Sequence, residues 1–377
     1  MQVNGQRVLP ARRAGLIPRG TSRPSEPVNV SNQPNVGIPP VEGKELGHQR
    51  QKELVDRIMA EAETVSPDEK LRYLLVADKL LGCGNIPLPG IDTDVRKSEN
   101  GRYIRGMCHC SKGICPICLP YQDAVRAEKL RVQAGEVVKL GLRNFLFTVT
   151  IRHYYGAKFK ELLNAERKMW AKTTGHRRWK EAVAGMAWKF EVGFTAANGH
   201  HPHKHCIVSL REGVDEAEFV GWLKQYWEIG LKKLGRSCDW KSGWWQVIPK
   251  TEDIDVMVGY IFKSIREVTG TSYKHNAPWL LPVAAYVEIF LGSRNMRFFG
   301  VGGCWKSTET TKCEEEGVLE GERKAKDPVL TVIPTIAWRK FTAAEKYLIK
   351  DVVYDKQIDD EHCVEVINTM VEMVMMC

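Results

Sequence analysis

Two histidines spaced two residues apart are the residues of this chain best suited to chemistry. The segment Gly199–Val208 reads GHHPHKHCIV, which is typical of a turn that leads into a buried strand. Side chains at positions i and i+2 of a strand project from the same face, so His203 and His205 can hold one metal ion together. His201 is a rival ligand, but we expect Pro202 to interrupt the strand ladder there. The histidine pair therefore predicts a metal centre.

A metal ion held by two imidazoles needs at least one further ligand. We expect a strand over 186–195 that forms a hairpin with the histidine strand, and it offers Glu191. A set of two histidines and a carboxylate leaves coordination positions open for a substrate phosphate, as a catalytic site does. The competing interpretation is a histidine-rich surface turn that binds transition metals only incidentally.

A tyrosine and a lysine one helical turn apart follow about fifty residues later. Tyr260, Lys263 and Glu267 share one stripe of a predicted helix, because their spacing is i, i+3 and i+7. A phenol with a pKa of ~10 is a poor nucleophile at neutral pH, and Lys263 or the metal would favour the phenolate. A metal centre with such a tyrosine indicates phosphodiester chemistry. The alternative is that Tyr260 simply packs in a core.

A CxC motif and a CxxC motif lie close together and predict a structural zinc site. The expected ligands are Cys108, Cys110, Cys115 and Cys118. Cys83 or His109 is a possible substitute for one of them, and free thiols near a turn are the alternative. We expect this zinc to stabilise the region before the sheet and to take no part in catalysis.

The composition is that of a chain with a sizeable core and a basic surface. Hydrophobic residues make up 43% of 377 residues, enough for two or three domains. A formal net charge of +9 favours a polyanionic partner. No run reaches the ~18 apolar residues of a membrane span, and the N-terminal sequence has no apolar leader. We therefore expect a soluble protein of a reducing cytoplasm.

The order of the expected elements indicates an α+β fold, with a central antiparallel sheet flanked by helices. A strand over 145–151 precedes an amphipathic helix, the hairpin, a further helix, a short strand and the tyrosine helix. We divide the chain into a disordered tail (1–43), a helical region with the cysteine cluster (44–140), a catalytic domain (141–305) and a C-terminal extension of unknown role (306–377).

The segment that follows the first strand is rich in lysine and arginine, with Trp170 and Trp179 interleaved. Such cations could follow phosphates while the tryptophans stack on unpaired bases. The alternative is that the tryptophans belong to the core and the charges form a solvated face. Further along the chain, Arg294, Arg297 and Trp305 are expected to line a DNA cleft.

Taken in order, three motifs resemble the rolling-circle replication initiators of plasmids and some phages, which belong to the HUH endonucleases. They are the strand over 145–151, the NGHHPHKH segment of 198–205 and the YIFK segment of 260–263. The likeness covers roughly residues 105–305, from before the CPIC motif to the end of the arginine block. It implies a nickase and strand transferase that depends on Mg²⁺ or Mn²⁺ and acts on single-stranded origin DNA, with a host helicase and polymerase as partners.

The resemblance also implies a role for each matching residue. His203 and His205 match the histidine pair, Glu191 the third ligand, Tyr260 the nucleophile and Lys263 the motif lysine. The tyrosine would attack a phosphodiester, become linked to the 5′-phosphate and release a 3′-hydroxyl that primes synthesis. The implied fold places the metal on one face of an antiparallel sheet, with the tyrosine helix beside it.

The chain departs from the family pattern at two positions. Lys204 lies between the histidines, where the family prefers an apolar residue, and it should point away from the metal. Ser264 occupies the position of a second tyrosine, which makes this a chain of the single-tyrosine type. In such relatives an acidic residue can activate water to end the cycle, and Glu267 and Asp253 are possible here.

Three other interpretations remain compatible with these motifs. A conjugative relaxase or a single-strand transposase would use the same chemistry in another setting. A zinc-stapled DNA-binding regulator with a degenerate site would bind DNA without cutting it. A metal-dependent hydrolase without a covalent step would cut DNA without needing Tyr260.

Overall fold

The structure is a computed structural model. It describes residues 41–89, 92–98, 101–110, 112–238, 240, 244–248, 258–259, 261–262, 277–306 and 327–376. The chain divides into two units, Met1–Pro34 and Asn35–Cys377, and every described residue lies in the second. Most of the tail expected over 1–43 therefore lies outside the described residues, whereas 41–43 already belong to the first helix.

The described part of the chain contains both helices and strands. The elements are α1 (Val41–Ala62), α2 (Pro67–Gly82), β1 (Thr93–Ser98), β2 (Gly101–Arg105), α3 (Cys118–Lys139), β3 (Arg143–Thr150), α4 (Phe159–Gly175), α5 (Arg177–Ala182), β4 (Val183–Thr195), β5 (Gly199–Leu210), α6 (Glu216–Lys233), β6 (Trp245–Ile248), the 3₁₀ turn Pro278–Leu280, α9 (Val283–Gly292), β7 (Phe299–Gly303), β8 (Val329–Ile333), α11 (Thr335–Lys340), α12 (Ala343–Tyr354) and α13 (Asp360–Met376). None of the described helices is both long and apolar enough to cross a lipid bilayer.

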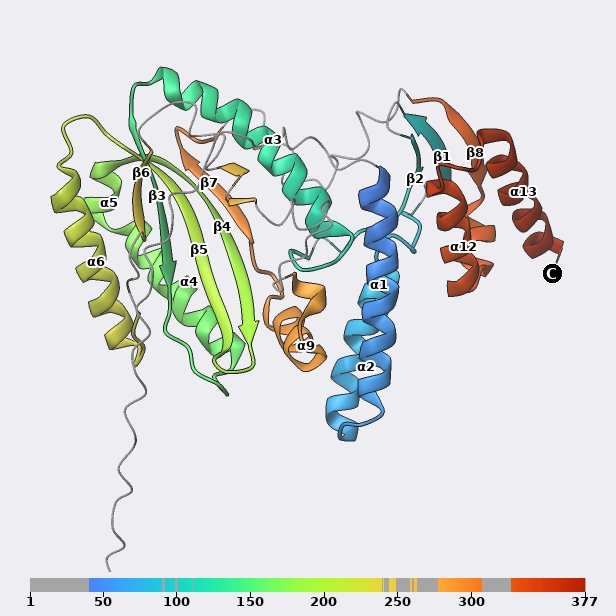
Figure 1. The fold of residues 1–377 in the computed structure, drawn as a ribbon, viewed down its shortest axis with the longest axis horizontal. Coiled ribbons are helices and arrows are strands. Elements are labelled where there is room, and N and C mark those ends of the chain that lie inside the picture. The colour runs from blue at the N-terminus through green and yellow to red at the C-terminus, as the bar shows by residue number, and fades with distance from the viewer. Residues whose placement is uncertain are drawn as a thin grey trace, which may run out of the picture. The chain divides into compact units, whose positions relative to one another are not determined.

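Five strands form the larger sheet, in the order β6-β3-β5-β4-β7, and every neighbouring pair is antiparallel (Figure 1). The β4–β5 hairpin at its centre runs from the pair Thr195–Gly199 at the turn to Val183–Leu210. Gly199 has φ +73°, and an added Cβ there would lie 3.2 Å from the Tyr154 carbonyl, so glycine suits this turn. The predicted α+β architecture, an antiparallel sheet flanked by helices, is confirmed at this level.

Helices cover both faces of this sheet, as the buried residues of its strands require. On one face Phe145 and Val149 pack with the apolar sides of α4, α5 and α6. On the other face Leu146 and Ile207 pack with α3 (Figure 1). Alternate residues of β3 are thus buried on opposite sides, which is why the neighbouring residues Phe145, Leu146 and Phe147 are all apolar.

The α4 face of the sheet contains Lys204, in the position where an apolar residue was expected. Its Nζ lies 2.7 Å from Glu166 Oε1 of α4, and both side chains are almost fully buried. The same ammonium lies over the rings of Trp170 and Trp188, 4.2 and 4.4 Å from their centroids. Burial lowers the pKa of Lys204, an effect that the Glu166 carboxylate opposes. An ion pair and two cation–π contacts thus take the place of an apolar contact.

Of the two interpretations of Trp170 and Trp179, the structure supports packing in the core and not stacking on DNA bases. Both rings are buried in the core between α4, α5 and the sheet, with 8% and 4% of their surface exposed. Trp305 is buried as well, and its Nε1 donates to the Ser209 hydroxyl, so it does not line an open cleft. These rings gain more from burial of their large apolar surface than they would from exposure.

The expectation that Pro202 interrupts the ladder is also wrong. Pro202 lies inside β5 and is paired with Val192 of β4. Proline is tolerated there because β3 ends at Thr150, opposite His203. Beyond that point β5 has a strand neighbour on one side only, so no ladder bond is lost on the other.

A second, three-stranded sheet has the order β2-β1-β8, again with antiparallel neighbours. Residues 327–376, which belong to the extension expected over 306–377, supply β8 and the helices α11, α12 and α13 that cover it. Cys363 and Ile367 of α13 are fully buried, so the C-terminal segment is a packing helix.

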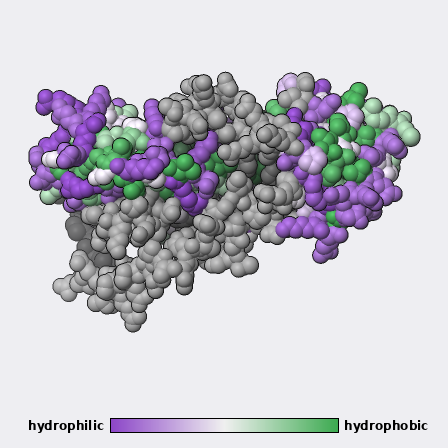
Figure 2. Space-filling view, turned by 90° about the horizontal axis from the view of Figure 1, so that it is seen from above, coloured by the Kyte–Doolittle hydropathy of each residue, from purple (hydrophilic) through white to green (hydrophobic). Residues whose placement is uncertain are grey.

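The same C-terminal elements also expose large apolar side chains. They include Val329, Val332, Ile336, Met373 and Met376. Figure 2 shows apolar and polar side chains interspersed over the surface on its right-hand side. Contacts with α1 connect these elements to the rest of the unit, since Tyr347 donates to Gln51 Oε1 at 3.1 Å.

We expect Lys204→Met to destabilise the protein, because it leaves the Glu166 carboxylate buried without its ammonium. The loss in free energy of unfolding should be about 3–5 kcal/mol. The double variant Lys204→Met, Glu166→Leu should recover most of it, since an apolar pair of similar volume replaces the ion pair. Urea unfolding measures both. Equal stability of the single variant and the wild type would contradict this account of the α4 face.

Candidate metal centre and cysteine cluster

Glu191, His203 and His205 come together on neighbouring strands at the centre of the larger sheet. Glu191 of β4 is directly paired with His203 of β5, and the next pair on the same face joins Lys189 to His205. One oxygen of Glu191 lies 3.1 Å from His203 Nε2 and 3.3 Å from His205 Nε2. The three ligand atoms all lie within 4.8 Å of one another, so the three side chains could hold one metal ion.

Hydrogen bonds on the far side of each imidazole fix its orientation. His203 Nδ1 donates to the His201 carbonyl at 3.2 Å. His205 Nδ1 lies 2.8 Å from the hydroxyl of Thr148, its partner across β3. In the tautomer that donates through Nδ1, each ring presents Nε2 as a metal ligand. The two rings are therefore held in the orientation that a metal ion requires.

The electrostatic surroundings keep Glu191 ionised. Burial opposes its ionisation, but contact with the two histidines and the charge of Lys189 hold the pKa of this carboxyl well below its usual range. Lys189 Nζ lies 3.9 Å from Glu191 Oε1 and 2.5 Å from Asp123 Oδ2 of α3. The donor set is then one carboxylate and two imidazole nitrogens, a mixed set that transition metals accept more readily than Mg²⁺ does.

The three ligands are not equally covered. His205 is buried, whereas the side chains of His203 and Glu191 are 17% and 15% exposed. An ion held by these three residues would have an incomplete coordination sphere on the exposed side. Such open positions distinguish catalytic sites from closed structural ones.

The predicted nucleophile and its lysine, Tyr260 and Lys263, lie outside the described residues, as do Asp253, Ser264 and Glu267. The described residues next to position 260 pack on the metal-bearing face of the sheet. Ile261 and Phe262 belong to the same buried cluster as Ile207 and α3. The Phe262 ring lies 5.1 Å from Lys189 Nζ, which is itself the neighbour of Glu191.

Four cysteines form a second group of potential ligands: Cys83, Cys110, Cys115 and Cys118. Their sulfur atoms approach to 3.3 Å between Cys83 and Cys118 and to 3.7 Å between Cys110 and Cys118. Four thiolates at ~2.3 Å around one zinc ion would be roughly 3.8 Å apart, because the arrangement is tetrahedral. The cluster therefore has nearly the dimensions of a structural zinc site.

The predicted ligand Cys108 is not part of this cluster, and Cys83, named as a substitute, takes its place. The backbone N–H of Cys108 donates to the Ile86 carbonyl at 2.7 Å, in the segment that follows α2. Its Sγ is directed to the Pro87 carbonyl at 3.7 Å. Cys83 reaches the cluster instead because it lies at the C-terminal end of α2, beside Cys110.

The thiols of this cluster need a cation to ionise together. Burial raises the pKa of Cys115 well above its usual value, and contact with the neighbouring thiols raises that of Cys118, while such contacts lower the pKa of Cys83 and Cys110, so the four do not ionise alike. A zinc ion would bind all four as thiolates and offset the free-energy cost of ionising buried thiols. The residues present therefore fit a structural zinc.

Helix α3 connects the cysteine cluster to the metal centre. It begins at Cys118, and Asp123, little more than one turn later, forms the buried ion pair with Lys189. Lys189 in turn lies beside Glu191. The position of the first turn of α3 thus helps to set the charge next to the carboxylate ligand.

Arg294 and Arg297, the predicted DNA-binding residues, are both exposed between α9 and β7. Phe298, next to Arg297, packs against Gly113 of the loop that carries Cys110 and Cys115. A Cβ added at Gly113 would lie 2.3 Å from the Phe298 ring. Lys112 of that loop is close enough to Arg294 for their charges to interact; burial, and to a lesser extent Arg294, lower the pKa of Lys112. A small group of cations thus lies beside the cysteine cluster.

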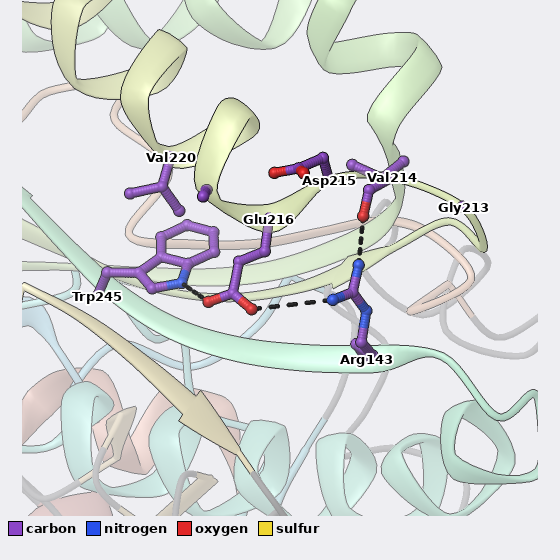
Figure 3. A pocket seen from close by; sticks show the side chains of 8 residues that line it. Arg143, Gly213, Val214, Asp215, Glu216, Val220 and Trp245 are labelled. Carbon is purple, nitrogen blue, oxygen red and sulfur yellow. Dashed lines mark hydrogen bonds and ion pairs between the residues drawn. The ribbon is translucent and has the colours of Figure 1, made fainter.

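A hollow of about 610 Å³ lies elsewhere, at the start of α6, lined by residues that include Arg143, Glu216 and Trp245. Figure 3 shows that its polar groups contact one another. Trp245 Nε1 donates to Glu216, and Arg143 contacts Glu216 and the Val214 carbonyl. None of the metal-centre residues lines it, and we assign it no role.

Comparison with known proteins adds no relative: no family model, no curated protein and no solved structure matches this chain. The assignment of this site therefore depends on its own geometry. Three contributors were not predicted from the sequence, namely Thr148, Lys189 and Asp123. The available signal was a polar residue inside an otherwise apolar strand, as at Thr148 and Lys189.

We expect Cys83→Ser to lose bound zinc and to lower the melting temperature, because structural zinc contributes directly to folding. Cys108→Ser is the matched control and should keep both zinc and stability, since its thiol lies outside the cluster. Elemental analysis and thermal unfolding of the purified variants measure the two effects. Loss of zinc from the Cys108 variant, with retention in the Cys83 variant, would overturn this ligand assignment.

We expect Thr148→Val to weaken Mn²⁺ binding about tenfold, because the hydrogen bond that orients His205 is lost while the shape of the side chain is kept. Isothermal titration calorimetry with Mn²⁺ measures the change. Thr150→Val is the matched control on the same strand, since the Thr150 hydroxyl bonds only to backbone carbonyls. Equal losses of Mn²⁺ affinity in the two variants would show that the Thr148 hydroxyl does not orient His205 for metal binding.

Proposed function

We propose that this chain is a rolling-circle replication initiator of the HUH endonuclease class, a DNA nickase and strand transferase that acts through a single tyrosine. The observation that carries the proposal is the convergence of His203, His205 and Glu191 around one potential ion position. Its open side suits a phosphodiester, because two imidazoles and a carboxylate leave coordination positions for substrate oxygens.

The surroundings of this centre support the proposal. The ligands lie on the two central strands of a five-stranded antiparallel sheet, which is the arrangement that the HUH nickase fold requires. Residues on both sides of position 260 pack on the same face of that sheet. Lys204, which departs from the HUH pattern, is accommodated on the opposite face by Glu166, so the departure does not alter the metal-bearing face.

The proposed reaction is a transesterification. A bound Mg²⁺ or Mn²⁺ would polarise the phosphodiester and stabilise the charge that develops on it. His203, His205 and Glu191 hold the ion, while Thr148 and the His201 carbonyl keep the rings in place. The Tyr260 hydroxyl loses its proton and attacks phosphorus, the bond to the 3′-oxygen breaks, and that oxygen leaves with the electron pair and takes up a proton. Lys263 stabilises the phenolate.

The product is a 5′-phosphotyrosine and a free 3′-hydroxyl. Attack of a 3′-hydroxyl on the phosphotyrosine reverses the reaction and rejoins the strand. In this proposal Arg294 and Arg297 bind DNA phosphates beside the zinc-bound cysteine cluster, and the protein works on origin DNA in the cytoplasm with a host helicase and polymerase.

A second candidate is a zinc-stapled DNA-binding regulator that does not cut DNA. The feature that favours it is the cysteine cluster, which is complete without any of the metal-centre residues. The two proposals differ in a single outcome, because only the nickase forms a covalent bond to DNA.

We expect the wild type, incubated with Mn²⁺ and single-stranded circular DNA of its own replicon, to form a covalent adduct at Tyr260. Tyr260→Phe should form none, because it lacks the attacking oxygen, while binding DNA with unchanged affinity. Denaturing gels and peptide mass spectrometry locate the adduct. Binding without an adduct in either protein would favour the regulator. Cleavage by both proteins without an adduct would favour a hydrolase.

We also expect His203→Ala or His205→Ala to abolish nicking that depends on metal, with a loss of at least about a hundredfold. The melting temperature of His203→Ala should change little, since that ring is partly exposed, whereas His205→Ala removes a buried ring and should lower it. His176→Ala is a control, because this histidine lies at the junction of α4 and α5, away from the metal centre. Full activity in either metal-site variant would rule out the proposed ligands.

A further inference from the structure

Two tyrosines project from the turn that follows β3. Tyr154 and Tyr155 are 60% and 71% exposed, although large aromatic side chains are usually well buried. The turn is well defined, because Ala157 N donates to the Tyr154 carbonyl at 3.1 Å and Gly156 has φ +87°. Its two ends are fixed by buried Ile151 and Ala157. The tyrosines are therefore held on a rigid turn and still face solvent.

A row of three imidazoles in contact connects this turn to the metal centre. His153, immediately before the tyrosines, stacks on His201 with ring centroids 4.4 Å apart. His201 contacts His203, a metal ligand, with centroids 5.1 Å apart. The backbone of the turn also approaches the hairpin, since an added Cβ on Gly199 would lie 3.4 Å from Tyr155 Cα. The exposed rings thus belong to the histidine end of the site.

The charge of the segment suits a polyanion. Residues 152–160 read RHYYGAKFK, with three cationic residues and no acidic one. Arg152, Lys158 and Lys160 are all exposed. Exposed aromatic rings among cations are the common features of surfaces that bind single-stranded DNA, where rings stack on bases and cations contact phosphates.

We propose that Tyr154 and Tyr155 form a stacking platform for unpaired bases of single-stranded DNA next to the metal centre. This rests on the proposed nicking function, which needs an unpaired strand at that place. The platform would bind the bases that flank the cut, while the metal centre holds the phosphodiester. It acts through the aromatic rings and not through the hydroxyl groups, so it has no part in the covalent step.

The test compares ring and hydroxyl removal in the full-length protein. Fluorescence anisotropy measures binding of a labelled oligodeoxythymidylate and of an abasic strand of the same length. Tyr154→Ala and Tyr155→Ala should each weaken oligodeoxythymidylate binding about tenfold, or ~1.4 kcal/mol. Tyr154→Phe and Tyr155→Phe should bind like the wild type, because phenylalanine keeps the stacking ring. Ile229→Ala, which removes a similarly exposed side chain from α6, should change nothing.

Three results would overturn the platform. They are unchanged binding by both alanine variants, equal losses in the phenylalanine variants, and equal losses on the abasic strand. A metal-dependent nicking assay of the wild type runs in parallel. Nicking by the wild type with unaffected alanine variants would reject the platform and keep the nickase. Weakened binding by the alanine variants without any nicking by the wild type would keep the platform and reject the nickase.

Discussion

The pairing register of β4 and β5 is the constraint on which the site depends. It places Glu191 opposite His203 and Lys189 opposite His205, all on one face of the sheet. If the pairing slipped by one residue, the side chains of one strand would move to the opposite face of the sheet, because side chains alternate along a strand. The slip would also move Lys204 away from Glu166, so the core on the α4 face opposes it as well. Folding and metal binding thus require the same register.

Buried charge is balanced separately on each face. Glu166 of α4 neutralises Lys204, and Asp123 of α3 neutralises Lys189, so one helix on each face of the sheet supplies a carboxylate. Such pairs add little net stability but are costly to break, which favours one arrangement of helix on sheet. Because α3 begins at a cysteine of the cluster, zinc binding and the electrostatics of Glu191 depend on the same helix.

Local pattern predicted the central hairpin and the convergence of Glu191, His203 and His205, since alternation along a strand and pairing across a hairpin are short-range rules. The features that were predicted wrongly or not at all depend on distant partners. Cys83 replaces Cys108 because the end of α2 reaches a cluster formed about thirty residues later. Trp170 and Trp179 are buried because α4 and α5 pack on the sheet, and β8 pairs with β1 across more than two hundred residues. These contacts join residues far apart in the sequence, so no local sequence pattern identifies them.

The proposed chemistry depends most directly on one ion position, the one between Glu191, His203 and His205. A crystal of the protein soaked in Mn²⁺ and measured at the manganese absorption edge would locate bound manganese by anomalous scattering. We predict a peak within bonding distance of His203 Nε2, His205 Nε2 and the Glu191 carboxylate, with its remaining coordination positions toward solvent. A structure in which these three residues bind no ion, or in which manganese occupies another set of ligands, would contradict the account.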